Sequence, residues 1–237
     1  MLTFPRAAAT LLGVARTRIT AMQIRLVSPK TLALPVAGAA WLLGACSSSV
    51  VVQSEFPTPL IEPLPVSMGV ILDEELYNYI YAEAIPQQST WTIDLGDANV
   101  ALLEPLFASM FLETQTVPAV PLGPEHAGLD GVLHPTLAKF EFDVPIGQRD
   151  QFVEVWMQYN IALYEPDGKL VTEWPVSGYG KAELVGKREL AVRRAAIVAM
   201  REVGATISTK FASQPDVSYW LEERRNAAGS FAESRPN

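Results

Sequence analysis

One thiol stands out among the side chains that could take part in chemistry. Cys46 is the only cysteine in the 237 residues, and it follows the apolar Leu43 and the small residues Gly44 and Ala45. A single cysteine cannot form a disulfide within the chain. Either the thiol has a chemical role other than a disulfide, or Cys46 is simply one of the small apolar residues of this segment.

The other candidates for chemistry do not form a catalytic constellation. The two histidines, His126 and His134, lie in or beside a turn-rich stretch and belong to no His-Glu-x-x-His motif. Asp94 and Asp97 flank a glycine, but a strand end and a helix cap explain this pair. The glycines of residues 178–186 lack the spacing of a phosphate-binding loop. We therefore predict no catalytic residue, no metal site and no dissociable cofactor, and we do not expect an enzyme.

The first 45 residues differ in charge from the rest of the chain. They contain no Asp or Glu, residues 31–45 are uncharged and apolar, and the basic residues are Arg6, Arg16, Arg18, Arg25 and Lys30. The apolar run is shorter than the roughly 20 residues that cross a bilayer core. A basic flank, a short apolar run and small residues at its end are the layout of a secretory signal peptide. We predict that residues 1–45 are removed, and that translation starts at Met22.

The junction Leu43-Gly44-Ala45-Cys46 resembles the lipobox of bacterial lipoproteins. The resemblance implies cleavage between Ala45 and Cys46, a diacylglycerol on the Cys46 thiol and an acyl chain on its freed amine. Two or more chains anchor a protein stably, because each buried methylene contributes about 0.8 kcal/mol. The membrane is therefore the first predicted partner. In enterobacterial lipoproteins an Asp after the cysteine favours the inner membrane, so Ser47 implies the periplasmic face of the outer membrane.

The chain after the leader is strongly acidic. All 26 acidic residues but only 13 of the 18 basic ones lie in residues 46–237, which gives a net charge near −13. Such a surface repels phosphate backbones. Nucleic acids are therefore not expected among the partners.

The mature chain divides into three parts by composition. Prolines crowd residues 57–65 and favour extended backbone, so we interpret residues 46–65 as the lipidated cysteine and a tether. In the alternative, the apolar residues 50–52 and 60–61 lie along the domain. Residues 66–225 have the length of a single domain. Residues 226–237 are predicted to be disordered.

Apolar periodicity predicts the elements of this domain. Alternation indicates strands at residues 66–72, 91–95, 137–144, 153–163 and 170–180. Helical spacing indicates one helix capped by Asp97 and a longer one over about residues 187–211. The order of these elements favours an α+β fold, a two-layer sandwich of a mostly antiparallel sheet with two main helices on one face.

Two tryptophans are candidates for contacts with a protein partner. Trp156 has the parity of Glu154, Gln158 and Asn160, which places it on the sheet face that the helices leave uncovered. An exposed aromatic side chain on a sheet face is suited to binding a partner. We predict Trp156 and Trp174 as partner-binding residues.

In element order and in its ending, from Ala195-Ala-Ile to Tyr219-Trp-Leu221, the chain resembles envelope-assembly and transport-auxiliary lipoproteins, including those of ABC transport. The resemblance implies a non-enzymatic subunit or accessory of an envelope complex, which docks on envelope proteins through a sheet face or edge strand. The alternative is a module that binds a small lipid or glycan in a cavity lined by Phe107, Phe111, Phe140 and Phe142.

Overall fold

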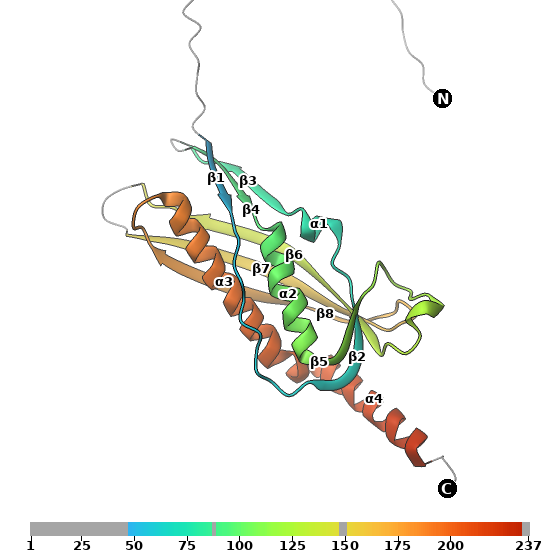
Figure 1. Cartoon of the computed structure of the whole chain (residues 1–237). Helices are drawn as coiled ribbons and strands as arrows, with labels where there is room; N and C mark the ends of the chain where they lie inside the picture. The colour runs from blue at the N-terminus through green and yellow to red at the C-terminus, as the bar shows by residue number, and fades with distance from the viewer. Residues whose placement is uncertain (1–46, 87–88, 147–150, 234–237) are drawn as a thin grey trace, which may run out of the picture. The chain divides into compact units, whose positions relative to one another are not determined.

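The computed structural model of the chain describes residues 47–86, 89–146 and 151–233 (Figure 1). The predicted signal peptide, its cleavage site and Cys46 lie outside these residues. The first described residue, Ser47, is already part of a strand.

A five-stranded sheet forms one layer of the domain. Its strand order is β5-β2-β6-β7-β8, and its three longest strands form an antiparallel meander. The other two strands are parallel, since β2 pairs with β5 on one side and with β6 on the other. The strands are β2 (Leu64–Val70), β5 (Phe111–Thr116), β6 (Gly131–Asp143), β7 (Phe152–Tyr164) and β8 (Leu170–Glu183).

A second, three-stranded sheet contains the start of the described chain. The central strand is β4 (Thr90–Asp94), which pairs in parallel with β1 (Ser47–Val51) and antiparallel with β3 (Ile80–Ala84). Its side chains reach the larger sheet, since the Trp91 ring lies 5.4 Å from the Phe142 ring. One hydrophobic core joins the two sheets and the helices.

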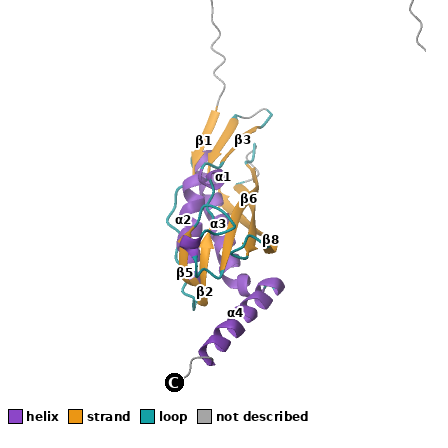
Figure 2. Cartoon of the chain, turned by 90° about the vertical axis from the view of Figure 1, so that its right-hand side faces the viewer, coloured by secondary structure: helices purple, strands orange, loops and turns teal. Residues whose placement is uncertain are grey.

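The two main helices cover the same face of the larger sheet, as Figure 2 shows. They are α2 (Gly96–Met110) and α3 (Arg188–Lys210). The shorter elements are α1 (Glu74–Tyr77), the 3-10 turns at Pro124–His126 and Phe211–Ser213, and α4 (Pro215–Glu233). The predicted α+β fold class is confirmed, and the parallel pairings of β1, β2 and β5 are added to it.

Helix α3 lies unusually close to strand β8. Gly178 and Gly180 face the helix, and a Cβ atom on Gly180 would meet the backbone of Ala195 and Ala199. The small residues of α3 at this contact are fully buried, as is Met200. Glycine is thus required at these two strand positions because the helix backbone occupies the space of a side chain.

A buried polar network fixes α2 to its neighbours. Asn99 is completely buried, and its Nδ2 donates to the carbonyl oxygen of Leu76 at 3.1 Å. The hydroxyl of Tyr159 donates to Asn99 Oδ1 at 2.5 Å. Each polar atom of this network has a partner, which burial demands. The network therefore joins α1, α2 and β7.

The N-terminal segment corrects the predicted tether. Residues 47–51 form β1, and Val50 and Val52 are buried in the core together with Phe56. The alternative that residues 50–52 lie along the domain is correct, because the side chains of Val50 and Val52 pack into the core while Val51, between them, is exposed. Leu60, by contrast, is fully exposed. The folded part of the described chain thus includes β1 and Phe56, which precede the start predicted at residue 66.

Three further differences have local causes. The cap predicted at Asp97 is wrong, because α2 begins one residue earlier and Asp94 accepts a hydrogen bond from the backbone of Gly96 at 3.1 Å. Strands β3 and β5 were not predicted, since neither shows apolar alternation. We predicted disorder for residues 226–237, but helix α4 continues to Glu233, so the backbone of residues 226–233 is helical.

Candidate docking surface

The face of β6, β7 and β8 that points away from the helices carries an aromatic pair. Trp156 lies on this face, as its parity predicts, and the strand register places it opposite Tyr179 of β8 and Glu141 of β6. Trp156 is half-buried and Tyr179 is 44% exposed. Lys139 extends over the Trp156 ring, with its Nζ 4.9 Å from the ring centroid. We call Lys139, Trp156 and Tyr179 the aromatic row.

The charged side chains in the aromatic row and beside it form ion pairs. Lys139 forms an ion pair of 2.6 Å with Glu141, and Lys181 forms one of 2.8 Å with Glu154. Hydrogen bonds from Lys181 and Tyr179 lower the pKa of Glu154. Ion pairs at an exposed face contribute little to stability. The same face also carries Phe152, with Lys181 Nζ 4.6 Å from the centroid of its ring. Aromatic rings surrounded by paired charges are the composition of a partner-binding centre with a polar rim.

Trp174 does not lie on this face, and its role as a partner-binding residue stays a prediction. The register of β8 pairs it with Ile161, whose side chain points into the core. The Trp174 ring packs against Phe211 at 5.8 Å between centroids. Trp174 therefore covers the end of α3 instead of contacting a partner through the open face.

The free edge of β8 is protected against pairing with another strand. The Glu202 side chain of α3 accepts a hydrogen bond from the Tyr179 backbone N–H at 2.7 Å. Arg194 donates to the carbonyl oxygen of Glu183 at 2.9 Å, and Pro175 has no N–H to offer. Proteins use such devices to prevent edge-to-edge association. Of the two docking modes that we considered, the sheet face is therefore favoured over the β8 edge.

The phenylalanines predicted to line a ligand cavity pack against other rings instead. Phe107 stacks on Phe111 with centroids 6.4 Å apart, and Phe140 lies 5.0 Å from Tyr81. An apolar pocket of about 230 Å³ lies elsewhere, between the segment after β1 and the two main helices. Its apolar lining comes from Phe56, Pro57, Pro59, Leu102, Leu106 and Gly204. The pocket is smaller than most sites for drug-sized ligands, which span about 300–1,000 Å³.

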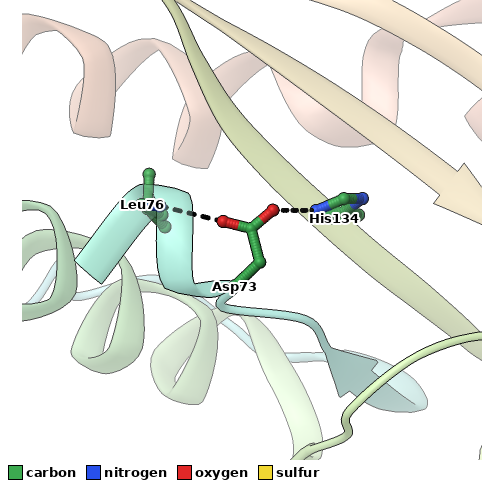
Figure 3. A network of polar contacts seen from close by, with 3 residues as sticks. All are labelled: Asp73, Leu76 and His134. Carbon is green, nitrogen blue, oxygen red and sulfur yellow. Dashed lines mark hydrogen bonds and ion pairs between the residues drawn. The ribbon is translucent and has the colours of Figure 1, made fainter. Parts of the chain in front are cut away.

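The closest carboxylate–histidine pair has a structural role. Figure 3 shows Asp73 between α1 and His134 of β6. Asp73 Oδ1 accepts from the Leu76 backbone at 2.9 Å and so caps α1, and Oδ2 lies 2.8 Å from His134 Nε2. Burial alone would raise the pKa of Asp73, but the hydrogen bonds from His134 and Leu76 lower it. Within the described part of the chain, no three His, Cys, Asp or Glu side chains gather as metal ligands.

The predicted lipidation site is directly connected to the folded domain. Cys46 lies outside the described residues, but it is bonded to Ser47, and consecutive Cα atoms lie about 3.8 Å apart. Ser47 is paired with Thr90 in the three-stranded sheet. A lipid on Cys46 would therefore be held within one residue of β1. In the described ranges, no helix combines the length and the hydropathy of a membrane span.

The sequence matches no protein-family model, and it matches no curated protein. A solved structure from Xanthomonas campestris, of the DUF330 family, is 12% identical, with a TM-score of 0.44 over 78% of this chain and 98% of that one. A Helicobacter pylori homologue of neuraminyllactose-binding hemagglutinin is 12% identical, with a TM-score of 0.47 over 71% and 96% of the two chains. A minor lipoprotein of Acinetobacter baumannii is 6% identical, with a TM-score of 0.38 over 62% and 92%.

Proposed function

We propose that this protein is a lipid-anchored periplasmic lipoprotein without enzymatic activity. It serves as a subunit or accessory of an envelope transport or assembly complex, on the periplasmic face of the outer membrane. The lipid on Cys46 holds it at the membrane. The open face of β6, β7 and β8 binds an envelope protein.

The observation that carries the proposal is the place of Cys46 in sequence and structure. The only thiol of the chain ends a lipobox-like junction behind a basic and apolar leader. Ser47, the first residue that the structure describes, already belongs to strand β1, where it pairs with Thr90. A cleavage between Ala45 and Cys46 would thus leave β1 in the mature chain. A lipid on Cys46 would then be joined to a strand of the folded domain, which supports an anchor at Cys46.

The aromatic row supports a protein as the partner. Tryptophan and tyrosine are enriched among the residues that dominate binding energies, especially where polar residues surround them. Trp156 and Tyr179 are neighbours on adjacent strands, and the charges beside them are paired. A partner can therefore cover the rings without leaving a buried charge unpaired, which would be costly.

The proposed docking face is tested by co-purification from membranes in mild detergent. We expect Trp156→Ala to weaken capture of the partner by about tenfold or more, because truncating a central aromatic side chain costs at least about 2 kcal/mol of binding. Tyr219→Ala is the matched control, since Tyr219 is 64% exposed on α4, outside the open face. Equal amounts of co-purified protein with both variants would contradict docking through the aromatic row.

The pocket beneath Phe56 supports a second candidate function, the binding of a small lipid or glycan. Its lining is mostly apolar and only Arg201 among its residues is charged. Ala205 lines the pocket from an exposed position on α3, so Ala205→Leu would reduce the volume of the pocket. We expect mass spectrometry of the purified protein to find a ligand that this variant lacks. A wild-type protein without any bound ligand would contradict this function.

A further inference from the structure

The end of the domain that begins with Ser47 brings together several chain segments. β1 and β4 start there, β6 and β8 end there, and α3 begins there, as Figure 1 shows. The Ser48 hydroxyl donates to Glu189 in the first turn of α3 at 3.0 Å. α4 lies at the opposite end of the domain. We call the Ser47 end of the domain the anchor end.

Four large apolar side chains are exposed at the anchor end. They come from the ends of β6, β7 and β8 and from the first turn of α3, and their exposed fractions are 66% for Ile146, 40% for Phe152, 65% for Val185 and 47% for Leu190. The strand ends lie side by side, since Phe152 pairs with Glu183. Isolated apolar residues on a surface need no explanation, but a group at one end does.

Hydrogen bonds fix the backbone of the turn that carries Val185. Arg194 donates to the carbonyl oxygens of Glu183 and Val185, at 2.9 and 3.4 Å. The Leu184 N–H donates to the Gln151 carbonyl at 2.6 Å. Val185 thus lies in a turn whose backbone is fixed by hydrogen bonds. The exposure of this side chain is a fixed feature of the turn.

Basic residues lie beside the exposed apolar side chains. Lys187 and Arg188 directly follow the Val185 turn, and in the described part of the chain neither forms an ion pair. A Lys or Arg near an anionic membrane surface contributes about 1 kcal/mol of attraction. In a chain that is acidic overall, two unpaired cations beside four apolar side chains suit the headgroups of anionic phospholipids.

Chain connectivity places a bilayer at this end. The lipid on Cys46 would lie within one residue of Ser47, so the anchor end cannot move far from the membrane surface. We propose that the anchor end lies in the headgroup layer, with Ile146, Phe152, Val185 and Leu190 inserted among the phospholipids. This inference rests on the proposed lipid anchor. It implies that the strands β6, β7 and β8 extend away from the membrane and that α4 is the most distant element.

Site-specific fluorescence in vesicles tests this orientation. The lipidated full-length mature protein is purified, shown by intact mass to be acylated, and reconstituted into vesicles of phosphatidylethanolamine and phosphatidylglycerol. Because lipid occupies the sulfur of Cys46, an introduced cysteine is the only free thiol. An environment-sensitive fluorophore is attached to Val185→Cys at the anchor end or to Tyr219→Cys on α4, both exposed positions.

We expect the label at position 185 to shift its emission to the blue and to be quenched by phospholipids that carry a nitroxide near the headgroup. The label at position 219 should show neither effect. Unquenched emission at position 185 in acylated protein would overturn the membrane contact while leaving the anchor intact. Quenching at both positions would also overturn it, because the domain would then lie along the bilayer. A wild-type mass without acyl groups would instead refute the anchor itself, and the inference with it.

Discussion

The close approach of α3 to β8 makes Gly180→Ala the sharpest test of the packing. A Cβ atom at this position would lie 2.6 Å from the Ala199 backbone nitrogen and closer still to the Ala195 carbonyl oxygen, whereas ordinary contacts begin near 3.4 Å. Both neighbours are backbone atoms, so no side chain can rotate away. The whole helix must therefore move outward, and the buried residues under it lose contacts.

The expected cost follows from two opposing effects. Overpacking a core costs about 1–3 kcal/mol, and the upper end applies because backbone must move. Replacing glycine within a strand also stabilises the fold by up to about 1 kcal/mol, because the unfolded chain then has less conformational entropy to lose on folding. The net loss is about 2 kcal/mol in the free energy of unfolding, or roughly 4–8 °C in Tm for a domain of this size.

Urea unfolding of the mature chain, with Cys46→Ser in every variant, measures this loss. Ser177→Ala is the control, because Ser177 is an exposed residue on the opposite face of the same strand and should change stability by less than about 0.5 kcal/mol. If Gly180→Ala also stays within about 0.5 kcal/mol of the wild type, α3 does not lie on β8 as the structure has it.

Three further predictions concern stability. Tyr159→Phe leaves Asn99 Oδ1 without its donor and should cost about 1–3 kcal/mol by urea unfolding; an unchanged midpoint would contradict the buried network. Val52→Ala should cost about 2 kcal/mol, because Val52 is fully buried, whereas Leu60→Ala, at a fully exposed position, should be neutral; equal effects would mean that the segment is a free tether. The lowered pKa of Asp73 stabilises the fold only while the carboxylate is charged. The difference in unfolding free energy between wild type and Asp73→Asn should therefore narrow as the pH falls below 3.8, and a constant difference between pH 7 and 3 would refute this role.

Residue spacing predicted those strands and helices whose apolar residues recur at regular intervals. Residues of β6 and β7 alternate between apolar and polar types, and α3 carries one apolar stripe, so both the strands and the helix followed from spacing. The open face was predictable for the same reason, since Trp156 shares its parity with polar neighbours. The two-layer α+β class then followed from element order.

The remaining features depend on pairings distant in sequence. Ser47 pairs with Thr90. The sequence of β1 does not alternate between apolar and polar residues, so periodicity does not predict a strand there. The parallel pairings of β2 with β5 and β6 leave no turn signal, because parallel neighbours are not joined by hairpins. The face of Trp174 could not be predicted, because β8 faces the helix with Gly178 and Gly180, which interrupt the apolar alternation of the strand. The anchor end could not be predicted at all, since it combines the ends of β1, β4, β6, β7 and β8 with the start of α3.

Intact-mass measurement on the protein extracted from membranes tests the central claim most directly. The wild type should carry the mass of residues 46–237 plus a diacylglyceryl group and an acyl chain, and should remain in the outer-membrane fraction. Cys46→Ala should lose the acyl mass and leave that fraction. A wild-type protein without acyl mass that is released with the soluble periplasmic contents would contradict the anchor and the orientation built on it.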